Sequence, residues 1–260
     1  MRVLSWNLFH GRSLPETERS LLPEFSAALA AWPWDVALLQ EVPPWWGPAL
    51  ARATGAPWAR TALTSRNQLL CLRRAVASRR PGLLGSWGGG ANVILVRASA
   101  GVVTDHRRVR LTRTPERRVA HAVALAGSPL APEGVLWVGN LHASQADPLE
   151  RARADGARAE RWLLGLPGAG PAVVLGGDFN DREPPPGRPL RPVASRSVDH
   201  VQVGAALTAA AGAATLLRRA REVDGEMRRL SDHPPLSVEL RRAEAGKPVS
   251  EGEPDDKLRP

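Results

Sequence analysis

The sequence predicts an α/β fold, on three observations. Short apolar runs that are typical of buried strands recur along the chain, and amphipathic stretches of helical period lie between them. Polar side chains that bind metal ions or move protons stand where several of these runs end. Because α/β proteins place their chemistry where strand ends face a crevice, the pattern also predicts an active site at these ends.

The first third of the chain is expected to alternate strands and helices. Apolar runs at residues 2–6 and 36–39 predict strands, and helical patterns cover residues 16–31 and 46–54. The glycine-rich residues 82–90 are expected to form a flexible stretch before the next strand.

The middle third is expected to hold a series of strands and then one helix. The strand-like runs cover residues 91–97, 101–111, 118–125 and 136–141. A helix is expected at residues 149–164, because Pro148 stands just before the helical pattern and Gly165 just after it.

The last third returns to strands. Strand-like runs cover residues 172–175, 215–223 and 236–240. The segment 182–196 is rich in proline, which predicts a loop.

The domain boundary is expected near the C-terminal end. Residues 243–260 mix charge, glycine and proline without apolar periodicity, so they predict a disordered tail. Candidate site residues are spread over most of the remaining chain, so residues 1–242 are expected to form one domain.

The candidate chemistry lies at the ends of the expected strands. The polar residues there are Asn7, Glu41, His142, Asp178, Asp199, Asp232 and His233. Asn180 follows two residues after Asp178, and side chains two apart in an extended chain point to the same side. Taken alone, this segment equally fits an ordinary turn, because Asp and Asn after glycine are common turn formers.

In the order WN, LLQEV, NLH, GGDFN, VDH and SDHP, these segments resemble the endonuclease/exonuclease/phosphatase superfamily, which has the fold of deoxyribonuclease I and exonuclease III. The resemblance covers the chain from Met1 to about Arg241. It implies a four-layer α/β sandwich, in which two mixed β-sheets pack face to face with helices outside. It also implies a metal-dependent phosphoester hydrolase that uses Mg²⁺ or Mn²⁺.

The resemblance places the metal at Glu41 and Asn7, with Asp232 either as an alternative ligand or as a residue that supports the ligands from behind. A carboxylate at the end of a buried strand is the hard oxygen donor that Mg²⁺ prefers. Asn7 could instead fix Glu41 through its amide. Read singly, Glu41 also fits a charge at the start of the following helix, and Asn7 also fits a turn.

The acid–base roles follow from the same resemblance. His233 would act as general base or orient the phosphate, with Asp199 holding its other ring nitrogen. His142 would stabilise or protonate the leaving oxygen. Asp178 would orient or activate the attacking water, and Asn180 would bind a phosphate oxygen. How the base and acid roles divide among Asp178, His142 and His233 stays open.

Two further residues are expected to support substrate binding. Family members often carry an arginine before the strand at residues 118–125, and register favours Arg118 over Arg117. A solvated basic turn explains the same pair. Asn92, at the start of its strand, matches a frequent family asparagine that supports the site.

The formal net charge of +9 suits an anionic partner such as nucleic acid. The positive charge is nearly all arginine, which a general compositional bias explains equally well. The best candidates for a basic rim are Arg107, Arg108, Arg110 and Arg113. Residues 108 and 110 share one face of the expected strand, so only part of the set can meet one ligand.

The chain is expected to be a cytoplasmic monomer. No signal peptide or membrane-length apolar run is found, and the single cysteine cannot form an internal disulfide. Cys71 lies between two leucines, which predicts a buried, inert thiol.

The substrate is not fixed by these residues, because the same site serves many phosphoesters. A phosphodiesterase or nuclease is the first expectation. The alternatives are a phosphatase of a small phosphorylated metabolite or lipid headgroup, and a non-catalytic phosphoester-binding protein of the same fold. Retention of Glu41, Asp178 and His233 argues against the non-catalytic alternative.

Overall fold

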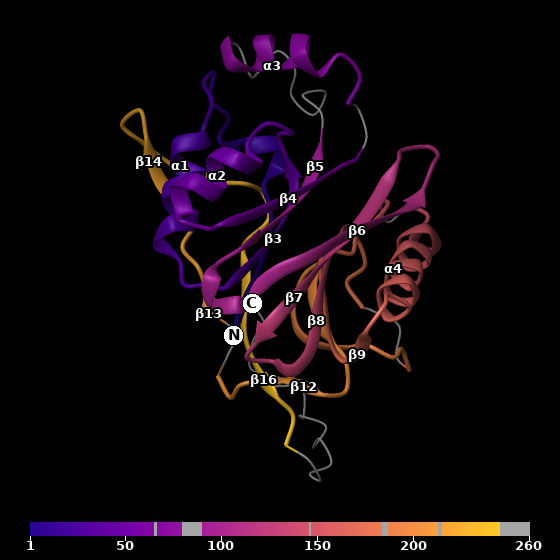
Figure 1. Ribbon diagram of the computed structural model, residues 1–260. Coiled ribbons are helices and arrows are strands. Elements are labelled where there is room, and N and C mark those ends of the chain that lie inside the picture. The colour runs from indigo at the N-terminus through magenta and orange to yellow at the C-terminus, as the bar shows by residue number, and fades with distance from the viewer. Residues whose placement is uncertain (65–66, 80–89, 146, 184–186, 213–214, 245–260) are drawn as a thin grey trace.

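The structure is a computed structural model that describes residues 1–64, 67–79, 90–145, 147–183, 187–212 and 215–244 (Figure 1). The glycine-rich stretch expected to be flexible, apart from Gly90, lies outside the described residues. The expected tail also lies outside them from residue 245 onward. No helix in the described part of the chain is long and apolar enough to cross a membrane.

Two large sheets form the centre of the molecule. The first has the order β12 (Leu207–Ala209), β16 (Leu236–Arg242), β1 (Arg2–Asn7), β3 (Val36–Val42), β5 (Ala91–Val96) and β4 (Trp58–Leu63), and β13 (Thr215–Leu216) also pairs with β16. The second has the order β10 (Arg191–Arg196), β11 (Asp199–Val203), β9 (Ala169–Asp178), β8 (Ala131–His142), β7 (Arg118–Ser128) and β6 (Val102–Thr112). Both sheets are mixed, since β1 runs parallel to β3 and β8 parallel to β9.

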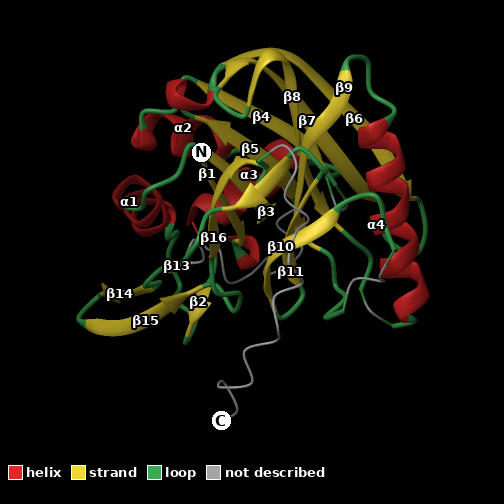
Figure 2. Ribbon diagram, turned by 90° about the horizontal axis from the view of Figure 1, so that it is seen from below, coloured by secondary structure: helices red, strands yellow, loops and turns green. Residues whose placement is uncertain are grey.

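The two sheets pack face to face, and helices cover their outer faces (Figure 2). Helices α1 (Leu22–Ala31) and α2 (Gly47–Thr54) cover the first sheet, and α4 (Leu149–Leu164) covers the second. This arrangement confirms the expected four-layer α/β sandwich.

Strand alternation explains how β1 serves two cores at once. Val3 belongs to the core between the sheets, whereas Leu4 and Trp6 belong to the core beneath α1 and α2. Successive side chains of a strand point to opposite faces, so a strand buried on both sides reads as a continuous apolar run. This is why the apolar runs predicted most of the central strands.

Several elements differ from the sequence-based expectation. Helix α1 begins at Leu22, with Pro23 in its first turn, rather than at residue 16. The expected strand at residues 215–223 is divided into β13 and β14 (Ala220–Val223). Strand β14 forms a small third sheet with β15 (Glu226–Leu230) and β2 (Ser13–Leu14).

The expected loop at residues 182–196 contains a strand, β10. Pro192 is tolerated there because β10 is the edge strand of its sheet and the pairing shifts between Pro192 and Ala194. An edge strand needs only half of its backbone groups for the ladder, so proline content alone was misleading.

The prediction of a buried Cys71 is wrong. Cys71 is exposed on α3 (Leu70–Arg79), which lies at the top of Figure 1. The neighbouring Leu72 is 61% exposed, so the leucines that suggested burial do not mark a core here.

Candidate active site

Polar ends of strands from both sheets meet at one pocket of about 350 Å³. The predicted site residues that line it are Glu41, Arg118, His142, Asp178, Asn180, Asp232 and His233. Asn7 and Asp199 lie directly behind this lining and are each at most 2% exposed. The fold thus brings together residues that are up to 226 positions apart in the chain.

Asp178 stands at the centre of the site because of the pairing of its strand. It lies opposite His142 on β8 and opposite Asp199 on β11. Gly177 makes this approach possible, since its φ is +141° and a Cβ there would lie 2.0 Å from the carbonyl oxygen of Leu141. Any other residue at this position would push β9 away from β8.

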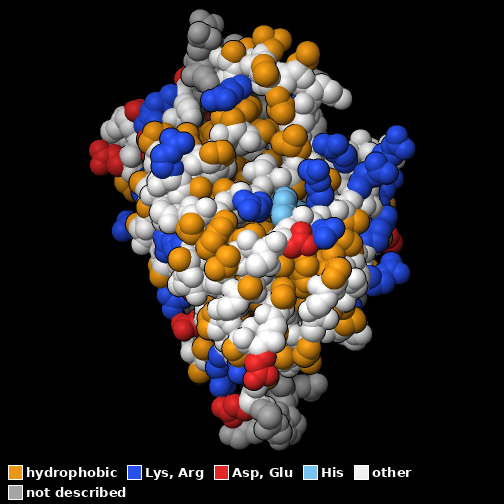
Figure 3. All heavy atoms as spheres, viewed as in Figure 1, with side chains coloured by type: hydrophobic (Ala, Val, Ile, Leu, Met, Phe, Trp, Pro, Cys, Tyr) orange, Lys and Arg blue, Asp and Glu red, His pale blue; other side chains and the backbone are white. Residues whose placement is uncertain are grey.

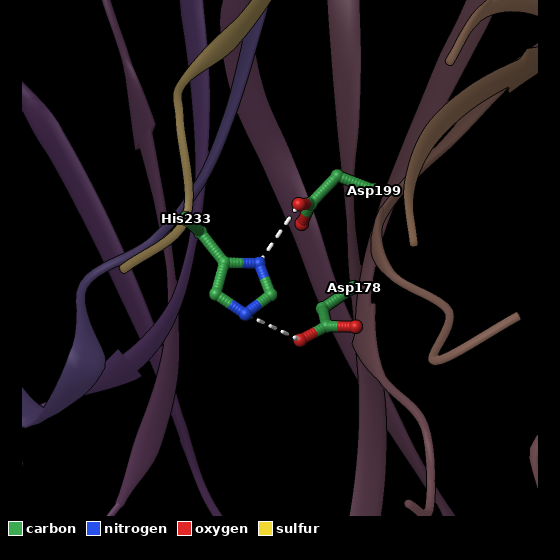
Figure 4. Close-up of side chains that lie close together, drawn as sticks. All are labelled: Asp178, Asp199 and His233. Carbon is green, nitrogen blue, oxygen red and sulfur yellow. Dashed lines mark hydrogen bonds and ion pairs between the residues drawn. The ribbon is translucent and has the colours of Figure 1, made fainter. Parts of the chain in front are cut away.

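His233 is held between two carboxylates (Figure 4). Its Nδ1 lies 2.8 Å from Oδ2 of Asp199, and its Nε2 lies 3.9 Å from Oδ2 of Asp178. The bond to Asp199 fixes the ring, so that Nε2 is the nitrogen that faces the pocket.

The charges around this pair shift both pKa values. Burial raises the pKa of Asp199 to about 7. Burial acts to lower the pKa of His233, but the hydrogen bond and charge of Asp199, with the charges of Asp178 and Asp232, outweigh it and raise that pKa to about 9. The proton between Asp199 and His233 therefore stays bound at neutral pH, and the His233 ring is charged.

The raised pKa of His233 gives a prediction for the metal-free protein. Asp199→Asn removes the largest effect that raises it, so the pKa should fall from about 9 toward the ordinary value of 6.5. Proton NMR of the ring in EDTA measures this. Because the raised pKa belongs to the folded state, the contact stabilises the fold fully below pH 6.5, and this stability is lost as pH rises through about 9. An unchanged pKa in the variant would contradict the pairing.

The turn that carries His233 is hydrogen-bonded to β1. The hydroxyl of Ser231 donates to the carbonyl oxygen of Asn7 at 2.6 Å and accepts from the backbone N–H of His233 at 3.0 Å. The indole N–H of Trp6 donates to the carbonyl oxygen of His233 at 2.9 Å. These bonds fix the imidazole relative to the first sheet.

Asn7 and Asn180 both donate hydrogen bonds to Asp178. The amide nitrogen of Asn7 donates to Oδ2 of Asp178 at 3.0 Å, and the backbone N–H of Asn180 donates to Oδ1 at 3.0 Å. The side chain of Asn180 donates to the carbonyl oxygen of Ala143. Among the described residues no hydrogen bond joins Asn7 to Glu41, so Asn7 orients the central carboxylate rather than the predicted metal ligand.

Glu41 reaches the pocket through an irregularity in β3. The pairing with β5 shifts between Leu39 and Val42, and Glu41 has a φ of +49°. Such a bulge re-aims a side chain, here toward the pocket. The carboxylate lies 3.1 Å from Nε2 of His10 and 3.9 Å from Nε2 of His142.

His142 is buried against Arg118. The guanidinium nitrogen Nη1 lies 3.2 Å and 3.3 Å from the two ring nitrogens, and Arg118 also pairs with Glu116 at 2.8 Å. Burial, followed by the charge of Arg118, lowers the pKa of His142 well below 6.5, so the imidazole is neutral at pH 7. Its Nε2 lies 3.6 Å from Asp178.

Backbone strain gathers at the pocket. Of the eight described residues other than glycine with positive φ, four line the pocket and a fifth, Ser231, precedes Asp232. The four are Phe9, His10, Glu41 and Asn180. Left-handed backbone is costly for such residues and persists where the surrounding structure enforces it, which is common at functional sites.

Two predicted residues are placed away from the centre. Asp232 is exposed at the pocket rim, and its one described hydrogen bond is to its neighbour Ser231. Asn92 is fully buried and donates to the carbonyl oxygen of Val119, next to Arg118. Asn92 therefore supports the strand that carries Arg118 and does not line the pocket.

Sequence reasoning missed seven residues of the lining, namely Phe9, His10, Arg12, Thr64, Gly90, Glu116 and Gln145. Two of them, His10 and Glu116, contact predicted site residues. His10 was not among the predicted site residues, and its Nε2 lies 3.1 Å from the Glu41 carboxylate. Glu116 was not singled out, and it neutralises Arg118. The histidine three residues after Asn7 was the available signal for the first, whereas nothing local marks the second.

The donor set fits a hard divalent cation. Three carboxylates line the pocket without an arginine partner among the described residues, namely Glu41, Asp178 and Asp232. Carboxylate oxygens are the ligands that Mg²⁺ and Mn²⁺ take. The described residues also hold one group of three acidic or histidine side chains whose ligand atoms lie within 4.8 Å of one another, namely Asp178, Asp199 and His233. Within this group Asp199 is already bonded to His233 at 2.8 Å.

Comparison with solved structures agrees with the fold. An endonuclease/exonuclease/phosphatase from Beutenbergia cavernae aligns with a TM-score of 0.65 and 20% identity over 96% of this chain and 73% of that chain. The mannosyl-6-phosphatase Bt3783 of Bacteroides thetaiotaomicron aligns with a TM-score of 0.63 and 15% identity over 92% and 99%. TDP2 of Caenorhabditis elegans aligns with a TM-score of 0.62 and 15% identity over 94% and 74%. A search of curated proteins gave no match.

The family assignment comes from the sequence as a whole. The sequence model of the Endonuclease/Exonuclease/phosphatase family matches residues 4–233, a range that contains every pocket residue described above. With this match over most of its length, the chain belongs to the endonuclease/exonuclease/phosphatase family.

Proposed function

We propose that the protein is a divalent-metal-dependent phosphoester hydrolase, and a phosphodiesterase or nuclease in particular. The observation that supports this most is the position of His233, held by Asp199 at 2.8 Å with its other nitrogen facing Asp178 across the pocket. An imidazole and a carboxylate that share one pocket with Glu41 provide the groups that hydrolysis needs.

Asp178 is the group that takes the proton of the attacking water. It lies at the base of the pocket, where Asn7 and the N–H of Asn180 fix its two oxygens. In the reaction, a water oxygen bonds to phosphorus, its proton passes to Asp178, and the bond from phosphorus to the leaving oxygen breaks. The restraint on Asp178 matters because a misplaced base loses most of its effect.

His233 and His142 have different tasks. The Asp199 carboxylate keeps the His233 ring protonated. The His233 imidazolium therefore donates from Nε2 to a phosphate oxygen and stabilises the charge that develops there. His142 is neutral and lies beside Arg118. In this proposal the two side chains together stabilise the leaving oxygen.

Glu41 would hold the metal ion, and Asp178 and Asp232 line the same pocket. When bound there, Mg²⁺ or Mn²⁺ supplies positive charge to the phosphate oxygens. His10 at 3.1 Å restrains the Glu41 carboxylate.

Chelation tests the metal assignment. Hydrolysis of a small phosphodiester is expected to stop in EDTA and to return when Mg²⁺ or Mn²⁺ is added in excess, because the carboxylates that line the pocket without an arginine partner would hold the cation. The assay compares a diester with a monoester at equal concentration. Full activity in a metal-free preparation would refute the metal assignment.

The same panel tests the second candidate, a phosphatase of a small phosphorylated metabolite. The likeness to a mannosyl-6-phosphatase favours keeping this candidate. Hydrolysis of monoesters alone would select it over the phosphodiesterase. Absence of turnover on every ester with metal present would leave the non-catalytic alternative.

A further inference from the structure

The active-site pocket adjoins a row of two further cavities. It shares Thr64 and Glu116 with a second cavity of about 620 Å³. The second shares Leu63 and Arg117 with a third cavity of about 350 Å³, which is also lined by Arg108 and Arg110. We call the second and third cavities together the arginine groove. It leads from the pocket along the edge of β4 to β6.

Strand alternation builds the basic wall of this groove. Arg108 and Arg110 lie two apart on β6, so their side chains share one face of the strand, and both line the groove. Val109 between them also borders the groove and packs against the core beneath α4. Arg107 and Arg113, in the same hairpin, line none of the three cavities. The face that the sequence predicted for residues 108 and 110 is thus the face that meets the groove.

The guanidinium of Arg117 is held by hydrogen bonds, and Arg117 also lines the groove. Its Nε donates to the carbonyl oxygen of Thr64 at 2.8 Å, and its Nη2 donates to that of Leu63 at 3.3 Å. Two carbonyl oxygens orient the guanidinium without neutralising it.

The groove carries uncompensated positive charge. Among the described residues, no carboxylate pairs with Arg108, Arg110 or Arg117, whereas Arg107 pairs with Asp105 at 2.7 Å. The one acidic residue of the groove, Glu116, pairs with Arg118 at 2.8 Å. Figure 3 shows arginine side chains gathered on this face of the molecule around β6.

The surroundings of His106 report the same positive field. Burial lowers the pKa of this imidazole, and the charges of Arg60 and Arg108 lower it further. Arg60 lies on β4 and Arg108 on β6, so positive charge comes from both strands.

Protection of an edge strand explains part of this charge. Strand β6 is at the end of the second sheet, and charged side chains on an edge prevent pairing with another chain. Edge protection does not explain Arg117, which lies before β7 and is anchored so that it points into the same groove.

We propose that the arginine groove binds the phosphate backbone of a single-stranded nucleic acid whose scissile phosphate lies in the pocket, an inference that rests on the proposed function. A small phosphorylated molecule would fill the pocket alone, and only a chain with repeated phosphates reaches the cations beyond Glu116. No described residue that lines the groove is aromatic, so phosphate contacts rather than base stacking supply the affinity.

The test measures binding in EDTA, so that no turnover is needed. A labelled single-stranded oligonucleotide of about 12 nucleotides is titrated with the full chain over a series of salt concentrations. The groove variant is R108Q/R110Q. The matched control is R107Q/R113Q, which removes the same two charges from the same hairpin but not from the groove.

The groove variant is expected to bind at least about tenfold more weakly at 50 mM salt, because two phosphate contacts and their counterion release are lost. The slope of log K against log salt should fall by about 1.4, about 0.7 for each contact. The control should keep the wild-type slope. Equal losses in both variants would show that only net charge matters and would overturn the proposal.

Three other outcomes would also overturn it. These are no binding by the wild type at low salt, tighter binding of a duplex than of the single strand, and aggregation of R108Q/R110Q with unchanged affinity of its monomer. The last outcome would establish edge protection as the role of these arginines.

Hydrolysis of a small diester by the wild type separates this inference from the proposed function. Normal hydrolysis without oligonucleotide binding would refute the groove alone and favour a small phosphoester substrate. A difference in binding between the two variants, with no hydrolysis of any ester, would support the groove and refute the proposed function.

Discussion

Asp178→Asn is expected to lower kcat for phosphodiester hydrolysis by at least about a hundredfold, within the range that general acid–base groups supply. The carboxylate accepts hydrogen bonds from Asn7 and Asn180 and faces both His142 and His233. An amide of the same shape can keep the packing but cannot take a proton from water. Steady-state kinetics at saturating Mg²⁺ measures the loss, and circular dichroism checks the fold.

A matched control for this variant lies three residues further along the chain. Asp181 is also a buried aspartate, but it pairs with Arg153 at 3.0 Å and does not line the pocket. Asp181→Asn is therefore expected to cost stability and leave kcat close to that of the wild type. A comparable loss of kcat in both variants would mean that Asp178 acts on the fold and not on the reaction.

His233→Ala is expected to lower kcat by at least about a hundredfold as well. Asp199→Asn should act through the imidazole, because Asp199 is buried behind His233 and bonded to Nδ1 at 2.8 Å. The double variant should thus be little worse than the worse single variant. The four kcat values measure this coupling.

A control for the imidazole comes from the same strand as Asp199. His200 points away from the pocket, where it contacts Ser195 and the carbonyl oxygen of Asp181. His200→Gln should leave kcat unchanged. If the losses of His233→Ala and Asp199→Asn multiply in the double variant, the two residues do not work as a pair.

Much of the fold could be predicted because its signals are local. Strands buried on both faces are continuous apolar runs, as in β1, β3 and β9, and helix α4 carries its own start and stop signals in Pro148 and Gly165. The polar residues at the strand ends were visible for the same reason.

What could not be predicted depends on contacts between distant segments. Strand β4 was missed because its side chains are mostly only partly buried, so they lack a clear apolar pattern. The exposure of Cys71 depends on where α3 lies and not on its leucine neighbours.

The site shows the same limit. The bulge that aims Glu41 and its contact with His10 follow from pairing with β5 and from a turn beside β1, neither of which is written in the LLQEV segment. The same holds for Asn7, which was expected at Glu41 and is bonded to Asp178 across the gap between the two sheets.

The most direct test of the central claim is the turnover of a small phosphodiester by metal-stripped protein as Mg²⁺ is titrated in. Glu41→Gln is measured beside the wild type, and Glu133→Gln, an exposed residue outside the pocket, is the control. The wild type and the control are expected to gain activity and saturate along the same curve, whereas Glu41→Gln should need far more Mg²⁺ or stay inactive. Hydrolysis that does not depend on Mg²⁺, or a Glu41→Gln curve that overlays the wild type, would contradict a metal-dependent site at this pocket.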